Sequence, residues 1–578
     1  MILQALTEYY RTLADKGKIS PPGWSDVKVS YALYIGKDGI LEQVIPIQTE
    51  QRKGNKTVLM PQAMKLPAPV KRSSGISSNF LWDTSSYLLG VDGKGKPQRA
   101  LDCFEACKAL HEKLLQKVNS PAARALLAFF QTWQPGQAAA HPALAPYLEE
   151  ILSGVNLVFQ YGGGYVHQDP LIQNAWDSHY QTAEDSPAMV CLVTGERGPV
   201  ESIHPSIKNV QGAQSSGAAL VSFNAAAFCS YGKEQNYNAP TSKYASFAYT
   251  TALNQLLSDR EHVYRIGDAS VVCWAKCGGN VYQDLMGWFS FGQEEPPYTL
   301  AELQRALKNL CAGKFAELDE QQLDPNMEFY ILGLSPNAAR LSVRFFLRNS
   351  FGAFLRNVQA HQQRLEIVKP LYDKFDTIPL WKLLSETVNQ NSRDKAAAPN
   401  MSGEVLRAIL TNTRYPANLL NGVTLRIRAE HTVTRGRAAI LKAYYLKNPH
   451  PDIPKEVLTV SLNPDSTNIP YNLGRLFSVL EAVQSAANPG INSTIKDKYF
   501  NSASATPAMV FPVLLNLSQK HLKKLDIGLR THYDKQTTAI LSKLGESYPS
   551  RLNLPQQGSF QLGYYHQTQA RFEKKEEK

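Results

Sequence analysis

The residues best suited to do chemistry in this sequence are basic and amide side chains, gathered in a few short stretches. The first stretch, residues 71–79, reads KRSSGISSN. Lysine and arginine anchor phosphates, glycine lets a backbone approach closely, and small polar side chains suit a narrow DNA groove. These types suit contact with DNA, with a surface loop of no function as the alternative. The candidate residues are Lys71, Arg72, Ser73, Ser74, Gly75, Ile76 and Asn79.

A second stretch is rich in asparagine and glutamine. It contains Tyr231, Gln235, Asn238 and Ser242. Amides can hydrogen-bond to base edges and to sugar hydroxyls, so one interpretation is contact with nucleic acid. Ordinary turn chemistry is an equally good interpretation.

Arginines form two further groups. Ser335 and Pro336 are typical of a helix start, which predicts a long helix over 336–368. Arg340, Arg344 and Arg348 would then form one ridge that binds phosphates or faces solvent. A second basic cluster, with Tyr444 and Tyr445 available to stack on bases, contains Arg426, Arg428, Arg435, Arg437 and Lys442.

Signatures of catalysis are weak. Residues 54–57 (GNKT) lack the glycines of a phosphate loop, and the twelve histidines include no HExxH. The pairs Cys103/Cys107 and Cys273/Cys277 have the wrong spacing for a zinc knuckle, so we expect core packing. The sequence therefore predicts no catalytic residue, no metal site and no cofactor. Two alternatives stay open: a nucleic-acid-processing enzyme with an unrecognised active site, and, more remotely, a metabolic enzyme with a cysteine-bound metal.

The elements that must position these residues indicate a multidomain α+β protein. A strand hairpin is expected over 27–47 and two helices over 100–133, broken at Ser120-Pro121. Residues 389–403 are the best linker candidate. We expect an N-terminal α+β region over 1–155, a central α+β region over 156–388 that ends in the long basic helix, and a basic helical bundle over 404–578. The expected helices of that bundle are 402–413, 416–430, 435–447, 471–487, 511–526 and 530–545.

Composition narrows the class of protein. The 578 residues carry a net charge of +11, and +10 of it lies after residue 400, where 23 Lys and Arg face 13 Asp and Glu. Such an excess suits either a solubilising surface or a module that binds polyanions. Seven scattered cysteines favour free thiols in a reducing compartment. The most apolar late stretch, AMVFPVLLNL, is too short to span a membrane, so we expect a soluble, cytoplasmic protein.

Several blocks resemble the large subunit of the type I-C CRISPR interference complex, Cascade. They include 71–90 (KRSSGISSNFLWDTSSYLLG), 222–253, 332–346 (LGLSPNAARLSVRFF) and 494–515 (TIKDKYFNSASATPAMVFPVLL). Others are 471–482, 520–525 and 558–569, so the similarity runs from end to end.

The resemblance implies a non-catalytic role in antiviral defence. A member of this family reads the protospacer-adjacent motif on double-stranded DNA, supports R-loop formation, holds the displaced strand and recruits the helicase-nuclease. With that role implied, we predict that the stretch 71–79 reads the motif. Implied partners are crRNA, target DNA, the repeating backbone subunit, the handle-processing subunit and small subunits of Cascade. The resemblance also suggests that the C-terminal bundle is similar to a small subunit. Internal initiation between Met401 and Asn472 would make it separately.

Overall fold

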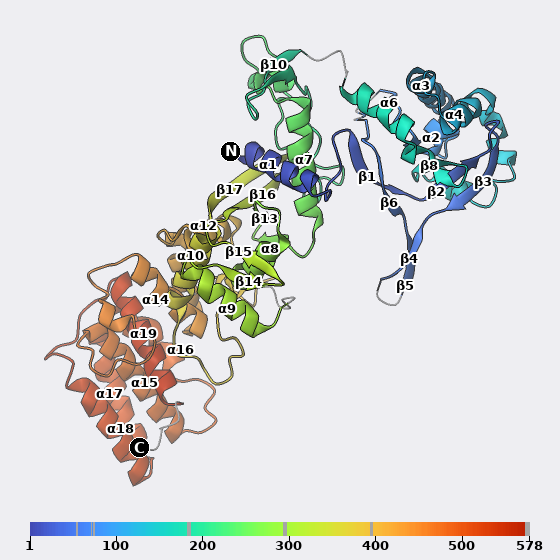
Figure 1. Cartoon of the computed structure of the whole chain (residues 1–578). Coiled ribbons are helices and arrows are strands. Elements are labelled where there is room, and N and C mark those ends of the chain that lie inside the picture. The colour runs from blue at the N-terminus through green and yellow to red at the C-terminus, as the bar shows by residue number, and fades with distance from the viewer. Residues whose placement is uncertain are drawn as a thin grey trace. The chain divides into compact units, whose positions relative to one another are not determined.

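The computed structural model describes residues 1–53, 56–70, 72, 75–181, 187–292, 298–393 and 397–572. The chain forms two compact units (Figure 1). Unit 1 comprises Met1–Ile207 and Ala219–Gln255, and unit 2 comprises Lys208–Ala218 and Leu256–Lys578. Both units mix helices and strands, and the C-terminal part is helical, so the predicted α+β class is confirmed.

Unit 1 is built on a small mixed sheet. Its strands are β3 (Leu41–Pro46), β2 (Tyr31–Ile35), β8 (Leu157–Tyr161) and β7 (Trp82–Asp83), in that order, with β9 (Gly164–Tyr165) beside β8. β2 and β3 form the predicted hairpin, and β2 pairs in parallel with β8. The hairpin turn needs glycine at Gly39, whose φ is +76° and where a Cβ would lie 2.2 Å from a backbone nitrogen of the next layer.

Helices α3 (Pro97–Leu115) and α4 (Pro121–Thr132) belong to the same hydrophobic core as this sheet. The predicted break between them is confirmed, because the Ser120 hydroxyl caps α4 by accepting from the first backbone amides. Phe129 and Phe130 of α4 lie edge-on to Phe159 of β8 in the shared core. The shorter helices here are α2 (Ser85–Leu88), α5 (Leu148–Leu152) and α6 (Pro170–Gln181).

Unit 1 has two further parts. β1 (Trp24–Val29) pairs with β6 (Gln62–Pro67), and the intervening chain extends as a hairpin of β4 (Thr49–Lys53) and β5 (Lys56–Met60). Helix α1 (Ile2–Asp15) packs against α7 (Lys243–Ser258), with the rings of Tyr10 and Phe247 5.7 Å apart. The short hairpin of β10 (Ala188–Val190) and β11 (Arg197–Pro199) lies before α7 in the chain.

Unit 2 begins with a four-stranded antiparallel sheet. Its order is β12 (Tyr264–Ile266), β13 (Ala269–Ala275), β16 (Glu328–Asn337) and β17 (Arg340–Ser350). The prediction of one long helix over 336–368 is therefore wrong for its first half. Residues 340–350 pair with β16, with one bulge at Arg344, and the helix, α10 (Phe351–Leu365), starts only after Ser350. Pairing with a neighbouring strand outweighs the local Ser-Pro signal.

Smaller elements link the strands of this sheet. They are α8 (Asn280–Met286), α9 (Leu300–Cys311), β14 (Ala316–Leu318) and β15 (Gln321–Leu323). The helices that follow α10 begin with α11 (Leu380–Ser385), α12 (Pro399–Thr411), α13 (Ala417–Glu430) and α14 (Arg435–Lys447). The last five are α15 (Ile469–Ala487), α16 (Ile495–Ala505), α17 (Pro507–Leu522), α18 (Ile527–Leu541) and α19 (Leu554–Ala570).

The six helices predicted after residue 400 are confirmed, with ends that shift by four residues or fewer, whereas α16 and α19 were not predicted. Helices α15 and α19 cross in backbone contact. A Cβ on Gly474 would lie 1.9 Å from a carbonyl oxygen of α19, and one on Gly563 would lie 2.0 Å from a carbonyl oxygen of α15.

One hydrophobic core extends through unit 2. It contains Ile331 of β16, Phe354 of α10, Leu406 of α12 and Phe477 of α15. The core therefore continues on both sides of residues 389–403, the stretch predicted as a linker, and α12 begins inside that stretch. Among the described residues, no helix combines the length and apolarity that crossing a membrane requires.

Candidate nucleic-acid interface

The loop between β6 and β7 is held at both ends by one buried carboxylate, that of Asp83. The Arg72 guanidinium forms a two-pronged ion pair with Asp83, with Nη1 3.1 Å from Oδ1, and lies 4.0 Å from the ring centroid of Tyr87. The backbone N–H of Asn79 also donates to Asp83, at 2.9 Å. The carboxylate thus ties residue 72 to residue 79.

The side chain of Asn79 closes the same loop from within. Its Oδ1 accepts from the backbone N–H of Val70 at 2.9 Å, and the residue is buried. Burial raises the pKa of Asp83, although the hydrogen bonds and charge of Arg72 act to lower it. An ionised Asp83 therefore depends on Arg72 as its partner.

These contacts change the predicted roles within the loop. Arg72 and Asn79 were predicted to read the motif, but both are engaged in fixing the loop, so we reassign them as positioning residues. Gly75 and Ile76, which lie between these two residues in the chain, are exposed. The remaining predicted residues, Lys71, Ser73 and Ser74, lie outside the described residues.

The second predicted stretch forms a loop that displays one aromatic ring. Tyr231 is 98% exposed and has a φ of +54°, in the left-handed region that a tyrosine seldom adopts. Gln235 is also exposed, with a φ of +46°. Exposed aromatic rings are the platforms on which single-stranded bases stack.

Asn238 holds this loop together. Its Oδ1 accepts from the Ser230 N–H at 2.8 Å, and its Nδ2 donates to the carbonyls of Lys233 and Gln235 at 3.0 and 2.8 Å. Ser242 caps α7 by accepting from the Ala245 N–H. The turn interpretation therefore describes Asn238 and Ser242, whereas Tyr231 and Gln235 are displayed to solvent.

Next to this loop, Cys191 accepts from the backbone amides of Val193 and Ser242 through its sulfur, at 3.4 and 3.2 Å. Burial acts to raise its pKa, but hydrogen bonds with Ser242 and Thr194 outweigh burial and lower the pKa to about 7. The thiol is buried. It joins the β10–β11 hairpin to the start of α7.

The three arginines predicted on a helix lie on strand β17. Arg344 occupies a bulge, where its Nε donates to the Ser335 hydroxyl at 2.9 Å and its Nη2 lies 2.5 Å from Asp268. Arg348 forms an ion pair with Glu328. A three-turn helical ridge is therefore not formed, and two of its three members pair with carboxylates.

The second basic cluster is mostly interior. Arg435, Arg437 and Lys442 are buried. The Arg435 guanidinium meets Asp373 at 3.1 Å and two backbone carbonyls, and Lys442 donates to the carbonyls of Arg364 and Glu366 at 3.1 and 2.6 Å. A buried cation that is already paired with protein oxygens cannot reach a phosphate, so we correct the prediction and assign these three a structural role.

Arg437 joins two glutamates in a chain of alternating charges. Its Nη2 lies 2.5 Å from Glu430, and its Nε lies 3.3 Å from Glu386. Arg426 extends the chain, with Nη1 3.5 Å from the other oxygen of Glu430. Arg428, which is exposed, donates to the side chain of Gln557 at 2.8 Å. Of the five predicted residues, only Arg426 and Arg428 stay near the surface.

A basic surface that the sequence analysis did not single out lies at the end of α17 and along α18. Its exposed members are Lys520, Lys523, Lys524, Arg530 and Lys535. Most residues of helix α18 are exposed or half-buried, with Ile540 as its buried residue. The close spacing of Lys520, Lys523 and Lys524 in the sequence is the signal that could have identified this surface.

A charged cluster in unit 2 joins the start of β12 to α8. His262 is buried between Asp259 and Asp284, with ring nitrogens 2.7 and 2.6 Å from their carboxylate oxygens, and the Tyr298 hydroxyl donates to Asp284 at 2.9 Å. Burial alone would lower the pKa of His262, but the hydrogen bonds and charges of the two aspartates raise it to about 9. At neutral pH the imidazolium bridges two carboxylates.

Cys103, Cys107 and Cys273 are buried members of the hydrophobic cores, as predicted. All seven cysteines are free thiols. Within the described part of the chain, no group of three or more His, Cys, Asp or Glu side chains is placed to hold a metal ion.

A family model described as a CRISPR-associated protein, Cas_Csd1, matches residues 6–572 of the sequence. The match takes in both compact units, from α1 to the end of α19. No curated protein matches the sequence.

Proposed function

The chain belongs to the CRISPR-associated Cas_Csd1 family, and we propose that it is the large, non-catalytic subunit of a crRNA-guided type I-C surveillance complex. In this role it reads a short motif beside the target on double-stranded DNA and holds the displaced strand while crRNA pairs with the other. Its partners in the proposal are the backbone, handle-processing and small subunits of Cascade, and the helicase-nuclease that it recruits.

The observation that carries the motif-reading part is the loop closed on Asp83. A reader of duplex DNA needs a loop whose tip is presented in one conformation, because disorder in the free protein lowers affinity when it is lost on binding. Arg72, Asn79 and the buried carboxylate hold the two ends of this loop within unit 1. Gly75 between them is exposed, and a glycine allows close approach to a groove.

The strand-holding part is supported by the displayed Tyr231 ring and by the exposed lysines at the end of α17. Stacking and phosphate contacts are the two interactions that bind single strands without sequence preference. The excess positive charge after residue 400 agrees with this assignment.

The test is target binding by the reconstituted complex, with and without this chain, on duplexes with randomised flanks. We expect flank-dependent binding only when the chain is present. Arg72→Ala should weaken binding to the preferred flank far more than binding to a complementary single strand. Arg124→Ala, an exposed arginine on α4, is the matched control. Equal losses on both substrates would overturn motif reading, and flank-dependent binding without the chain would overturn the large-subunit assignment.

A further inference from the structure

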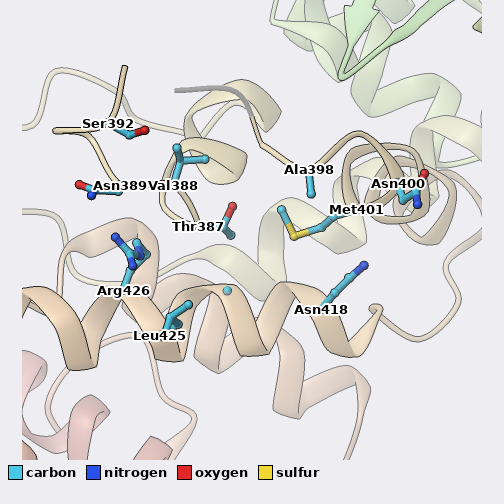
Figure 2. A pocket seen from close by; sticks show the side chains of 11 residues that line it. Thr387, Val388, Asn389, Ser392, Ala398, Asn400, Met401, Asn418, Leu425 and Arg426 are labelled. Atoms are coloured by element: carbon cyan, nitrogen blue, oxygen red, sulfur yellow. The ribbon is translucent and has the colours of Figure 1, made fainter. Parts of the chain in front are cut away.

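A cavity of about 560 Å³ lies in unit 2 between the turn at residues 387–392, the start of α12 and one face of α13. Figure 2 shows α13 along its floor, with Thr387 and Asn389 on one side and Met401 on the other. The volume falls within the roughly 300–1,000 Å³ typical of sites for small molecules. Its chemistry is set mainly by Asn389, Asn400, Met401, Asn418, Leu425 and Arg426.

The described lining carries one positive charge and no carboxylate. The charge belongs to Arg426, whose side chain is only 15% exposed. Its ion-pair partner Glu430 lies 3.5 Å away and makes a shorter contact, 2.5 Å, with Arg437. Because Glu430 is shared between two guanidiniums, Arg426 keeps the capacity to bind an anion. Guanidinium groups match phosphate oxygens in a two-pronged geometry.

The rest of the lining suits a planar, hydrogen-bonding ring. Leu425 is 60% exposed and offers apolar contact to a ring face, whereas Met401, which also lines the cavity, is 5% exposed. Asn389, Asn400 and Asn418 carry the carboxamide groups that pair with base edges. The Asn389 Oδ1 already accepts from the Asn391 N–H at 3.0 Å, so its amide nitrogen is the group it offers to a ligand. Asn418 donates to Glu404 at 3.0 Å through its nitrogen, so its carbonyl oxygen is the group it offers to a ligand.

The cavity wall and floor are fixed to each other by the chain of alternating charges. Glu386, directly before Thr387 in the wall, accepts from the Thr434 hydroxyl at 2.8 Å and pairs with Arg437. Arg437 in turn binds Glu430, on the floor helix α13. Gly422 of that helix has no side chain, and a Cβ there would lie 3.0 Å from the Thr387 Cβ. The cavity is therefore a preformed feature of unit 2.

We propose that this cavity receives one unpaired nucleotide, with its phosphate on Arg426 and its base against Leu425 and the asparagine carboxamides. Displaced DNA and crRNA share this chemistry. That either strand reaches the cavity rests on the proposed function, whereas the binding of a nucleotide does not.

The first experiment uses the full chain alone and measures its affinity for fluorescent oligothymidine and oligouridine of twelve nucleotides. Arg426→Gln should weaken binding about tenfold, because it removes a charge-assisted contact. Leu425→Glu should weaken binding by a similar factor, because it places a negative charge where the base rests. Arg407→Gln on α12 and Ala417→Glu at the first residue of α13 are exposed controls outside the cavity lining, and their affinities should stay unchanged.

The second experiment identifies the strand. The reconstituted complex is assembled on target DNA with 5-iodouracil in the displaced strand in one arm and in crRNA in the other, then irradiated and mapped by mass spectrometry. An adduct on the peptide that contains Met401 or Leu425, lost in Leu425→Glu and kept in Ala417→Glu, supports the proposal and names the strand.

The proposal is overturned if Arg426→Gln and Leu425→Glu bind oligonucleotides like their controls, or if neither arm gives an adduct in the cavity. Failure of the large-subunit role gives a different pattern. In that case the complex shows no flank-dependent binding that needs this chain, while the two cavity variants still lower the affinity of the isolated chain.

Discussion

Replacing Asn238 with alanine should abolish the display of Tyr231 while changing the free energy of unfolding little. The Asn238 carboxamide makes three hydrogen bonds within the loop, and alanine removes all of them. At about 1 kcal/mol each, their net contribution is about 3 kcal/mol. Against this, the left-handed conformations of Tyr231 and Gln235 cost about 1–2 kcal/mol each.

The two terms nearly cancel, so the loop can relax in the variant without destabilising unit 1 as a whole. We expect the free energy of unfolding of Asn238→Ala to fall by about 1 kcal/mol or less. Affinity for single-stranded nucleic acid should fall much more. Loss of one stacked base costs about 1–3 kcal/mol, which is about 5- to 150-fold in the dissociation constant.

The assay compares the anisotropy of a labelled single strand with urea denaturation of the same proteins. Tyr231→Ala should lose the same affinity as Asn238→Ala, and Tyr231→Phe should keep it, because the ring is retained. The double variant should be no weaker than either single variant, since Asn238 acts through Tyr231. Asn224→Ala, an exposed amide in the preceding segment, is the control.

Three results would refute this reasoning. Wild-type affinity in Asn238→Ala beside a large loss in Tyr231→Ala would show that the carboxamide does not organise the loop. Losses that add in the double variant would show that the two residues act separately. A fall of more than 3 kcal/mol in the free energy of unfolding of Asn238→Ala would show that strain does not offset the hydrogen bonds.

Three other perturbations test the charged groups. Arg72→Ala should be destabilised at pH 7, because it leaves the Asp83 carboxylate buried without its partner, and should regain stability as falling pH protonates that carboxyl, whose pKa is raised. Thermal unfolding measured from pH 7 to 4 tests this, and a loss of stability that does not depend on pH would contradict it. Arg437→Met should lower the free energy of unfolding by about 3–5 kcal/mol, since Glu386 loses its guanidinium partner and Glu430 loses the nearer of its two. Urea denaturation that shows a loss below about 1 kcal/mol would argue against the buried chain of charges. His262 has a raised pKa of about 9, so the stability that its imidazolium adds to the folded protein is complete below pH 6.5 and is lost as pH rises through 9. The difference in urea midpoint between wild type and His262→Gln should therefore narrow over that range. A difference that stays constant would exclude a charged histidine.

The sequence alone predicted what short-range chemistry determines. The Ser120-Pro121 break, the hairpin of β2 and β3 and six of the helices after residue 400 depend on caps, turns and periodicity within one element, and all of them are confirmed. The end-to-end resemblance to a CRISPR-associated family rests on sequence blocks, and the family match over residues 6–572 confirms family membership.

Tertiary structure decided which of the predicted site residues are available to a ligand. Arg435 and Asp373 are 62 residues apart in sequence, and nothing near Arg435 marks it as buried. Residues 340–350 also depend on a distant partner. The local sequence predicts a helix there, but pairing with β16 makes them strand β17. Residue type states what a side chain can bind, but partners brought from elsewhere in the chain decide whether it faces solvent. Such tertiary partners decide that the Tyr231 ring is exposed to solvent and that the Arg437 side chain is buried.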